Sequence, residues 1–228
     1  MIELADLSLH VGQLRLQSVE LTVPQGAYGV LMGRTGSGKS TLLECLCGLR
    51  VAERGQVRLH GKDVTALPPR ERGIGYVPQD GALFATHTVR EHLAFSLVVR
   101  RWSRCDIERR CAELADWLQL AQLLDRKPVG LSGGERQRIA LGRALAFHPR
   151  ILLLDEPLSA VDEPAREQLY DVLRDVQRRT GATTLHVTHS QAEAAALADC
   201  VFQLRDGQVA ETRSANTVAF GRPIVEAP

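Results

Sequence analysis

Residues 33–40 read Gly33-Arg34-Thr35-Gly36-Ser37-Gly38-Lys39-Ser40, the segment that constrains the architecture of this chain most strongly. They follow an apolar run over 28–32, which predicts a strand buried on both faces. They precede a stretch of helical composition that ends before Gly48, a residue suited to the left-handed cap of a helix. The pattern G-x-x-x-x-G-K-[ST] between a strand and a helix is typical of loops that hold nucleotide phosphates. The sequence therefore predicts a central parallel strand, a phosphate-binding loop and a helix, in that order.

The residue types of this loop suit a nucleoside triphosphate, ATP or GTP, with Mg²⁺. Glycines let backbone N–H groups curl around a phosphate without Cβ clashes, and the N-terminus of a helix adds a partial positive charge there. We expect Lys39 to reach the β- and γ-phosphates and Ser40 to offer its hydroxyl to Mg²⁺, which prefers oxygen ligands. The predicted nucleotide-binding residues of this segment are Gly33, Arg34, Thr35, Gly36, Ser37, Gly38, Lys39, Ser40 and Thr41.

Hydrophobic periodicity organises the rest of the chain. Further strands are predicted over 3–9, 14–17, 55–59, 73–77, 151–154, 183–187 and 201–204, with a hairpin turn at Asp206-Gly207. Helices are predicted over 88–100, 104–119, 134–147, 164–179 and 190–198. The pattern indicates an α/β fold: a P-loop NTPase core with a mostly parallel sheet flanked by helices, an N-terminal antiparallel β subdomain and an inserted α-helical subdomain. We expect a single domain over 1–228, with its core in 1–85 and 150–212, the helical subdomain in 86–149 and a loosely packed tail over 213–228.

Two acidic residues, Asp155 and Glu156, directly follow the apolar strand over 151–154. Carboxylates at the end of a buried strand cost free energy unless a cation or hydrogen bonds compensate. Without the phosphate loop, a core strand that merely ends in exposed acids would be the better explanation. Because ligands gather at the carboxyl ends of parallel strands, we expect both acids near the Mg²⁺ at Ser40. Asp155 would orient metal-bound water, and Glu156 would act as general base on the attacking water or polarise it.

Two more polar residues follow apparent strands of the same sheet. His189 ends the run over 185–189 and would reach the γ-phosphate region, although in isolation a structural histidine is the better explanation. Gln79 follows the strand over 73–77 and could bind Mg²⁺ through its amide oxygen, although an ordinary surface glutamine is the better explanation unless a family resemblance supports the metal role. The predicted metal-site residues are thus Ser40, Gln79 and, through water, Asp155.

A second motif, over 131–138, reads Leu131-Ser132-Gly133-Gly134-Glu135-Arg136-Gln137-Arg138. It resembles the signature of ABC-type ATPases, and the order of motifs across 1–212 is similar to that family. The resemblance implies a homodimer in which two head-to-tail copies enclose two ATP molecules and complete each other's sites. In such a dimer Leu131, Ser132, Gly133, Gly134 and Glu135 would face the γ-phosphate held by the partner copy, through the serine hydroxyl and the glycine amides. The resemblance also implies that Asp162 contacts the opposite subunit and that His189 holds the γ-phosphate and the attacking water.

The sequence departs from the family pattern at two positions. Where the family often has an aromatic ring that stacks on adenine, this chain has Leu9-His10-Val11-Gly12, so Val11 would give an apolar contact without a π-face, or His10 would stack weakly. Adenine preference is therefore less secure than phosphate binding. Ser190 stands after His189 where the family commonly has an acid, and we expect only a small effect.

Segments 67–80, 125–128 and 185–189 resemble importer subunits of this family, and more narrowly those for molybdate or tungstate. This resemblance implies a peripheral subunit on the cytoplasmic face of the cell membrane, where ATP-driven dimer closure drives solute uptake. It implies a separate membrane permease, contacted near Gln79–Thr88, and indirectly a solute-binding protein. Leu83 and Phe84 could form an apolar groove edge for the permease, and packing of Phe84 into the core is an equally good explanation.

The alternatives are an exporter subunit and an ABC ATPase that acts outside transport. A DNA-repair or chromosome ATPase would need a long coiled-coil insertion, which the pattern does not contain. The resemblance also implies that the transported solute does not contact this subunit, so we expect no residue here to select it. Many of the similar importers carry a C-terminal regulatory domain, for which we expect 228 residues to be too few.

Composition excludes several other classes. The 28 basic and 27 acidic residues leave a net charge of +1, and only 4% of residues are aromatic, so nothing predicts nucleic acid binding. No apolar run reaches the roughly 18 residues of a spanning helix. The five cysteines lie in apolar patterns, which favours reduced thiols, and no zinc site is expected. We expect Arg100, Arg101 and Arg104 to form a solvated helix face.

Overall fold

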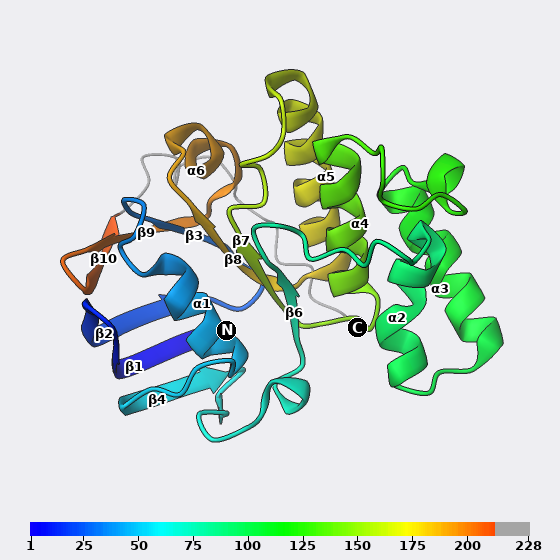
Figure 1. Ribbon diagram of the computed structural model, residues 1–228. Helices are drawn as coiled ribbons and strands as arrows, with labels where there is room; N and C mark the ends of the chain where they lie inside the picture. Colours follow the sequence, from blue (N-terminus) through cyan, green and yellow to red (C-terminus); the bar gives the residue numbers. More distant parts are fainter. Residues whose placement is uncertain (213–228) are drawn as a thin grey trace, which may run out of the picture.

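The computed structural model describes residues 1–212, which form two β-sheets with helices on both sides of the larger sheet (Figure 1). The smaller sheet is antiparallel, with the strand order β2-β1-β4-β5. Its strands are β1 (Ile2–Val11), β2 (Leu14–Val23), β4 (Arg54–Leu59) and β5 (Lys62–Asp63). The larger sheet has the order β10-β9-β3-β8-β7-β6 and is parallel except for its edge strand β10. Its strands are β3 (Tyr28–Met32), β6 (Ile74–Val77), β7 (Ile151–Asp155), β8 (Thr183–Thr188), β9 (Cys200–Arg205) and β10 (Gln208–Thr212).

The helices lie where hydrophobic periodicity predicts them. They are α1 (Lys39–Cys47), α2 (Val89–Val99), α3 (Arg104–Trp117), α4 (Gly133–Leu145), α5 (Glu163–Thr180) and α6 (Gln191–Leu197). Two short 3₁₀ turns, η1 (Pro69–Glu71) and η2 (Ala121–Leu123), were not predicted. The segment over 86–149 is helical as expected, and no strand interrupts it.

The predicted strands are confirmed, with one clear difference in length. The strand expected over 14–17 continues as β2 to Val23. Val19, Leu21 and Val23 are buried and alternate with exposed residues, so the pairing with β1 runs on to Ile2. The short Lys62–Asp63 strand, at the edge of the same sheet, was also missed because two residues carry no periodic signal.

Two apolar clusters lie on opposite faces of the larger sheet. One holds the smaller sheet and α1, and the other holds α2 to α6. Figure 1 shows this arrangement, with α1 on one side of the central strands and α4 and α5 on the other. Strands β7 and β8 are buried along their whole length, as expected of parallel strands covered on both faces.

The last described strands form the predicted hairpin. Asp206 and Gly207 have φ angles of 51° and 78°, the two positive values of a tight turn that matches strand twist, and β9 and β10 pair on either side. The predicted tail over 213–228 lies outside the described residues. Within residues 1–212 no helix is long and apolar enough to cross a membrane. All five cysteines are free of disulfide bonds.

Candidate functional site

The phosphate loop joins β3 to α1. Gly36 and Gly38 have φ angles of 79° and 102°, which residues with side chains rarely adopt. Because Gly38 is the N-cap of α1, no side chain occupies the first N–H groups of the helix. A Cβ on Gly33 would lie 2.8 Å from both the Ser37 hydroxyl and the Leu204 carbonyl oxygen. The Ser37 hydroxyl is buried and has no hydrogen-bond partner among residues 1–212. These unpaired donors at a helix N-terminus fit the oxygens of a nucleotide's phosphates.

Lys39 brings a positive charge to the base of this loop. The side chain is only 4% exposed. Its Nζ donates to the carbonyl oxygens of Gly33 and Arg34, both at 3.0 Å, and lies 3.8 Å from Oε1 of Glu156. These acceptors offset the cost of burying an ammonium group. The structure thus places a buried cation at the phosphate loop, and its contact with the β- and γ-phosphates stays a prediction.

Ser40 and Asp155 meet at the start of α1. The Ser40 hydroxyl donates to Oδ1 of Asp155 at 3.0 Å, although the two residues are 115 positions apart. Asp155 ends β7 and is buried; burial raises the pKa of its carboxyl, and the hydrogen bond from Ser40 partly offsets this. A hydroxyl beside a carboxylate is a donor set that Mg²⁺ accepts. Both residues therefore fit the predicted metal site.

Glu156 contacts both Lys39 of the phosphate loop and residues at the carboxyl end of β8. Its φ angle of 43° is unusual for a residue with a side chain, and its N–H donates to the Val187 carbonyl at 2.9 Å. Oε2 lies 3.3 Å from Nδ1 of His189, and Oε1 faces Lys39. His189 is 61% exposed, whereas Glu156 is 15% exposed. Lys39, Glu156 and His189 thus meet at the carboxyl ends of adjacent parallel strands.

The signature segment begins α4. The Ser132 hydroxyl accepts from the Glu135 N–H at 3.2 Å, and the Glu135 carboxylate accepts from the Ser132 N–H at 2.7 Å, which is a complete capping box. The Ser-x-x-Glu spacing carries this signal, which the motif comparison alone overlooked. Gly133 packs so closely on the Ala160 carbonyl oxygen that a Cβ would overlap it. Asp162, two residues further on, caps α5 by accepting from the Ala165 N–H at 3.1 Å.

Two further predicted site residues are Gln79, which lies apart from the phosphate loop, and Val11, which lies beside it. Gln79 lines a groove of about 470 Å³ together with Gly133 and Ala160, and no hydrogen bond within residues 1–212 joins it to Ser40 or Asp155. Val11 ends β1 and pairs with Leu14. The Leu14 side chain would lie 2.9 Å from a Cβ on Gly38, so this turn abuts the phosphate loop.

Two residues that the sequence did not single out hold the Gln79–Thr88 segment. His92 accepts from the Phe84 N–H at 2.9 Å through Nε2, and its Nδ1 lies 2.8 Å from the Thr88 carbonyl oxygen. Burial lowers the pKa of His92, which keeps the neutral form with one donor and one acceptor. Arg143 of α4 donates to the Gly81 carbonyl at 2.8 Å and to the Ala82 carbonyl. A histidine and an arginine on helix faces gave no signal because their partners are backbone carbonyls and N–H groups of a loop.

The fold and the cluster of side chains at the phosphate loop define the class of protein. A phosphate loop between a buried parallel strand and a helix, with a carboxylate pair at the carboxyl end of another strand of the same sheet, is the core of a P-loop ATPase cassette.

Comparison with known proteins agrees and is more specific. A family model described as ABC transporter matches residues 16–159. A molybdate/tungstate import ATP-binding protein of Archaeoglobus fulgidus is 53% identical over 184 residues, which cover 81% of this chain and 76% of that protein. Its counterpart in Thermococcus kodakarensis is 40% identical over 214 residues, 94% of this chain and 64% of that protein. The solved ATP-binding cassette MJ0796, in a dimeric post-hydrolysis state bound to ADP and Pi, superposes with a TM-score of 0.82 at 28% identity, over 94% of this chain and 100% of that chain.

The chain belongs to the ABC transporter family. It spans 76% of the length of the Archaeoglobus relative and 64% of that of the Thermococcus relative.

Proposed function

We propose that this chain is the ATP-hydrolysing subunit of an importer for molybdate, tungstate or a similar oxyanion. The cluster of Lys39, Glu156 and His189 beside the Ser40–Asp155 pair supports hydrolysis. The import ATP-binding relatives support the direction of transport and the solute class. The chain would act at the cytoplasmic face of the membrane against a separate permease, and indirectly with a solute-binding protein.

Bound ATP would supply the phosphoanhydride bond to be broken, and Mg²⁺ would neutralise phosphate charge. The chain's own residues prepare the rest of the site. Lys39 would exchange its carbonyl acceptors, Gly33 and Arg34, for phosphate oxygens. Glu156 would hold the attacking water and take its proton, while His189 fixes the orientation of that carboxylate through Nδ1. Ser40 and Asp155 would hold the metal directly and through water.

The proposed active form is a homodimer with composite sites. Ser132 is exposed at the start of α4, whereas the phosphate loop lies at the start of α1, on the other face of the larger sheet (Figure 1). The signature segment of one copy therefore does not face its own phosphate loop, and in a head-to-tail homodimer it would complete the site of the partner copy. Gly133 of the signature packs closely on Ala160, two residues before Asp162. The signature and Asp162 of one copy would therefore face the partner copy at the same contact.

The segment Gln79–Thr88 suits a permease contact. Phe84 is 40% exposed and packs 5.1 Å, between ring centroids, from the exposed Phe95 of α2. These rings lie beside the groove that Gln79 and Leu83 line. Hydrogen bonds join this segment to Arg143 of α4 and His92 of α2. A displacement of the segment by the permease would therefore be transmitted to α4, the helix that begins with the signature.

Substitution of Glu156 tests the catalytic assignment. We expect Glu156→Gln to lower ATP turnover roughly a hundredfold or more while leaving nucleotide binding in place, because the amide cannot take a proton. Glu167→Gln, an exposed change of the same kind on α5, is the matched control. Near-normal hydrolysis by the Glu156 variant would refute the assignment.

Mixed dimers test the composite site. Lys39→Ala and Ser132→Arg should each be inactive alone. A heterodimer of the two retains one site built from an intact phosphate loop and an intact signature, so mixing should restore hydrolysis. If mixing restores nothing although heterodimers form, the signature does not act across the dimer.

A further inference from the structure

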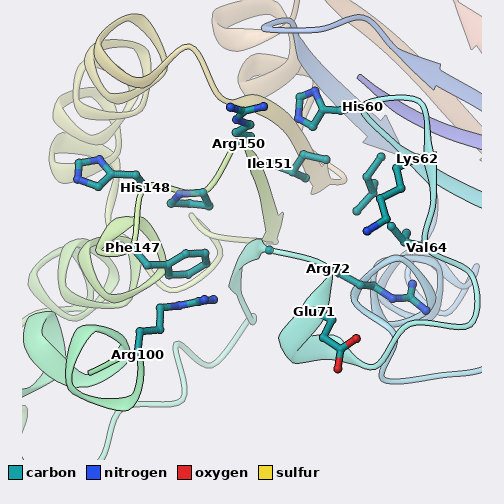
Figure 2. A pocket seen from close by; sticks show the side chains of 13 residues that line it. His60, Lys62, Val64, Glu71, Arg72, Arg100, Phe147, His148, Arg150 and Ile151 are labelled. Carbon is teal, nitrogen blue, oxygen red and sulfur yellow. The ribbon is translucent and has the colours of Figure 1, made fainter. Parts of the chain in front are cut away.

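A second cavity lies at the amino ends of β6 and β7, away from the strand ends that carry Asp155 and Glu156 (Figure 2). Its volume is about 290 Å³. Four segments that are distant in sequence form it: the β4–β5 turn, the connection before β6, the end of α2 and the connection from α4 to β7. Its lining residues are Leu59, His60, Lys62, Val64, Glu71, Arg72, Gly73, Arg100, Phe147, His148, Pro149, Arg150 and Ile151.

This cavity is strongly cationic in a nearly neutral protein. Its wall carries Lys62, Arg72, Arg100 and Arg150 against one acid, Glu71. Four positive charges and one negative charge leave an excess of three, whereas the whole chain carries +1. Glu71 is itself paired with Arg70, at 3.3 Å, outside the wall. The positive potential of this cavity is therefore local and is not a general property of the surface.

Only one of these cations is explained by the fold. Arg72 is buried and donates to four backbone carbonyl oxygens, among them those of Cys45 and Leu46 at the end of α1. It caps that helix. Lys62 and Arg150 are exposed, and within residues 1–212 no carboxylate lies within 4.0 Å of either charged group.

Arg100 is held at the cavity by an aromatic ring. Its guanidinium lies over Phe147, 4.1 Å from the ring centroid, which positions the group, and no residue among 1–212 accepts a hydrogen bond from its N–H donors. Figure 2 shows Arg100 and Lys62 extending toward the space between them from opposite sides, with Arg150 and His60 along the rim. The three cations thus reach the cavity wall from three separate segments of the chain.

Two histidines complete the wall. Burial is the main cause that lowers the pKa of both His60 and His148, so at neutral pH each imidazole is uncharged and has both a donor and an acceptor nitrogen. His148 stacks on Trp102, with 5.9 Å between ring centroids. Because Trp102 stacks on this cavity residue, its fluorescence can serve as a probe of the cavity.

We propose that this cavity binds a small, multiply charged tetrahedral oxyanion, held by Lys62, Arg100 and Arg150. Planar guanidinium groups and an ammonium group are the partners that such oxygens prefer. A volume of about 290 Å³ is at the lower end of ligand pockets, which suits a free oxyanion or the phosphate group of a small metabolite. Bound there, the anion ties the end of α2 to both sheets, so it stabilises the helical segment against the core.

Calorimetric titration of the chain carrying Lys39→Ala, which weakens the phosphate loop, tests the proposal. The probes are molybdate, inorganic phosphate and glycerol 3-phosphate, each at constant ionic strength. The cavity variant is Lys62→Gln with Arg150→Gln, and its control is Arg104→Gln with Lys127→Gln, which removes two exposed charges elsewhere. Trp117→Phe leaves Trp102 as the single tryptophan, because the chain has two, so its fluorescence reports on the cavity through the stacked His148.

We expect the cavity variant to bind at least about tenfold more weakly than the control and to lose the fluorescence change. The probe that binds most tightly distinguishes a free oxyanion from an organic phosphate. Equal affinity in the two variants, or no binding of any probe at millimolar concentration, would overturn the proposal. Neither result depends on ATP hydrolysis, so the proposal can fail while the function proposed above stands.

Discussion

The packing of α2 on α4 leads to a quantitative prediction. Gly142 of α4 faces two fully buried leucines, Leu93 of α2 and Leu118. A Cβ on Gly142 would overlap Cδ2 of Leu93 and lie 2.8 Å from Cδ1 of Leu118. Because Gly142 has no side chain, the Leu93 side chain can occupy the space beside it. The two substitutions Gly142→Ala and Leu93→Ala should consequently influence each other.

The magnitudes follow from burial. Leu93→Ala leaves a cavity and should cost about 2–5 kcal/mol of unfolding free energy. Gly142→Ala should cost about 1–3 kcal/mol through overpacking, less up to about 1 kcal/mol gained in helix propensity. In the double variant the added methyl occupies space that the leucine has left. The double variant should therefore be about 1–3 kcal/mol more stable than the sum of the single effects.

Urea unfolding followed by far-ultraviolet circular dichroism measures all four proteins of this cycle. The control cycle combines Gly142→Ala with Leu43→Ala, since Leu43 is equally buried but lies in the other apolar cluster. That pair should be additive within about 0.5 kcal/mol. Additive effects for Gly142 and Leu93 as well would refute the contact between them.

The remaining predictions concern a buried network beneath the site. The Tyr28 hydroxyl lies 3.0 Å from Nδ1 of the fully buried His186, so Tyr28→Phe should lower the unfolding free energy by about 1–3 kcal/mol in urea, and an unchanged midpoint would exclude this hydrogen bond. Burial alone would raise the pKa of Glu193, but the interactions of its carboxylate with His186, whose Nε2 lies 3.2 Å from Oε2, and with Thr188 outweigh burial and lower it. A carboxyl whose folded-state pKa is lowered stabilises the fold above its unfolded-state pKa, about 4.3, and loses that contribution as the pH falls through the folded value. Glu193→Gln should therefore flatten the decline of unfolding free energy below about pH 4.3, and an unchanged slope in acid titrations would contradict the pairing.

Much of the fold could be predicted because its signals are local. The apolar run over 28–32, the loop glycines and the helix that follows them form one contiguous signal, and the structure has them in that order. The hairpin at Asp206-Gly207 was equally visible. The extent of β2 was underestimated because its continuation depends on pairing with β1, which a single strand does not reveal.

The sequence predicted which residues belong to the site better than it predicted how they are arranged in space. The rule that strand ends of a parallel sheet converge led to Asp155 and Glu156, and the structure brings both to the phosphate loop. The catalytic and dimer roles of the named residues stay predictions. Arg100 was expected on a solvated helix face; it is exposed, but it also lies over Phe147 at the second cavity. Nothing in its local sequence indicates a partner 47 positions away.

The amino-acid sequence by itself determined the phosphate loop, the capped start of the signature helix and the order of strands and helices. Each of these depends on backbone conformations and hydrogen bonds between residues a few positions apart. Tertiary structure alone decided that Ser40 meets Asp155, that His189 meets Glu156 and that cations from separate elements line one cavity. Such contacts depend on how the elements cross the sheet, because only burial of apolar faces fixes which distant side chains become neighbours.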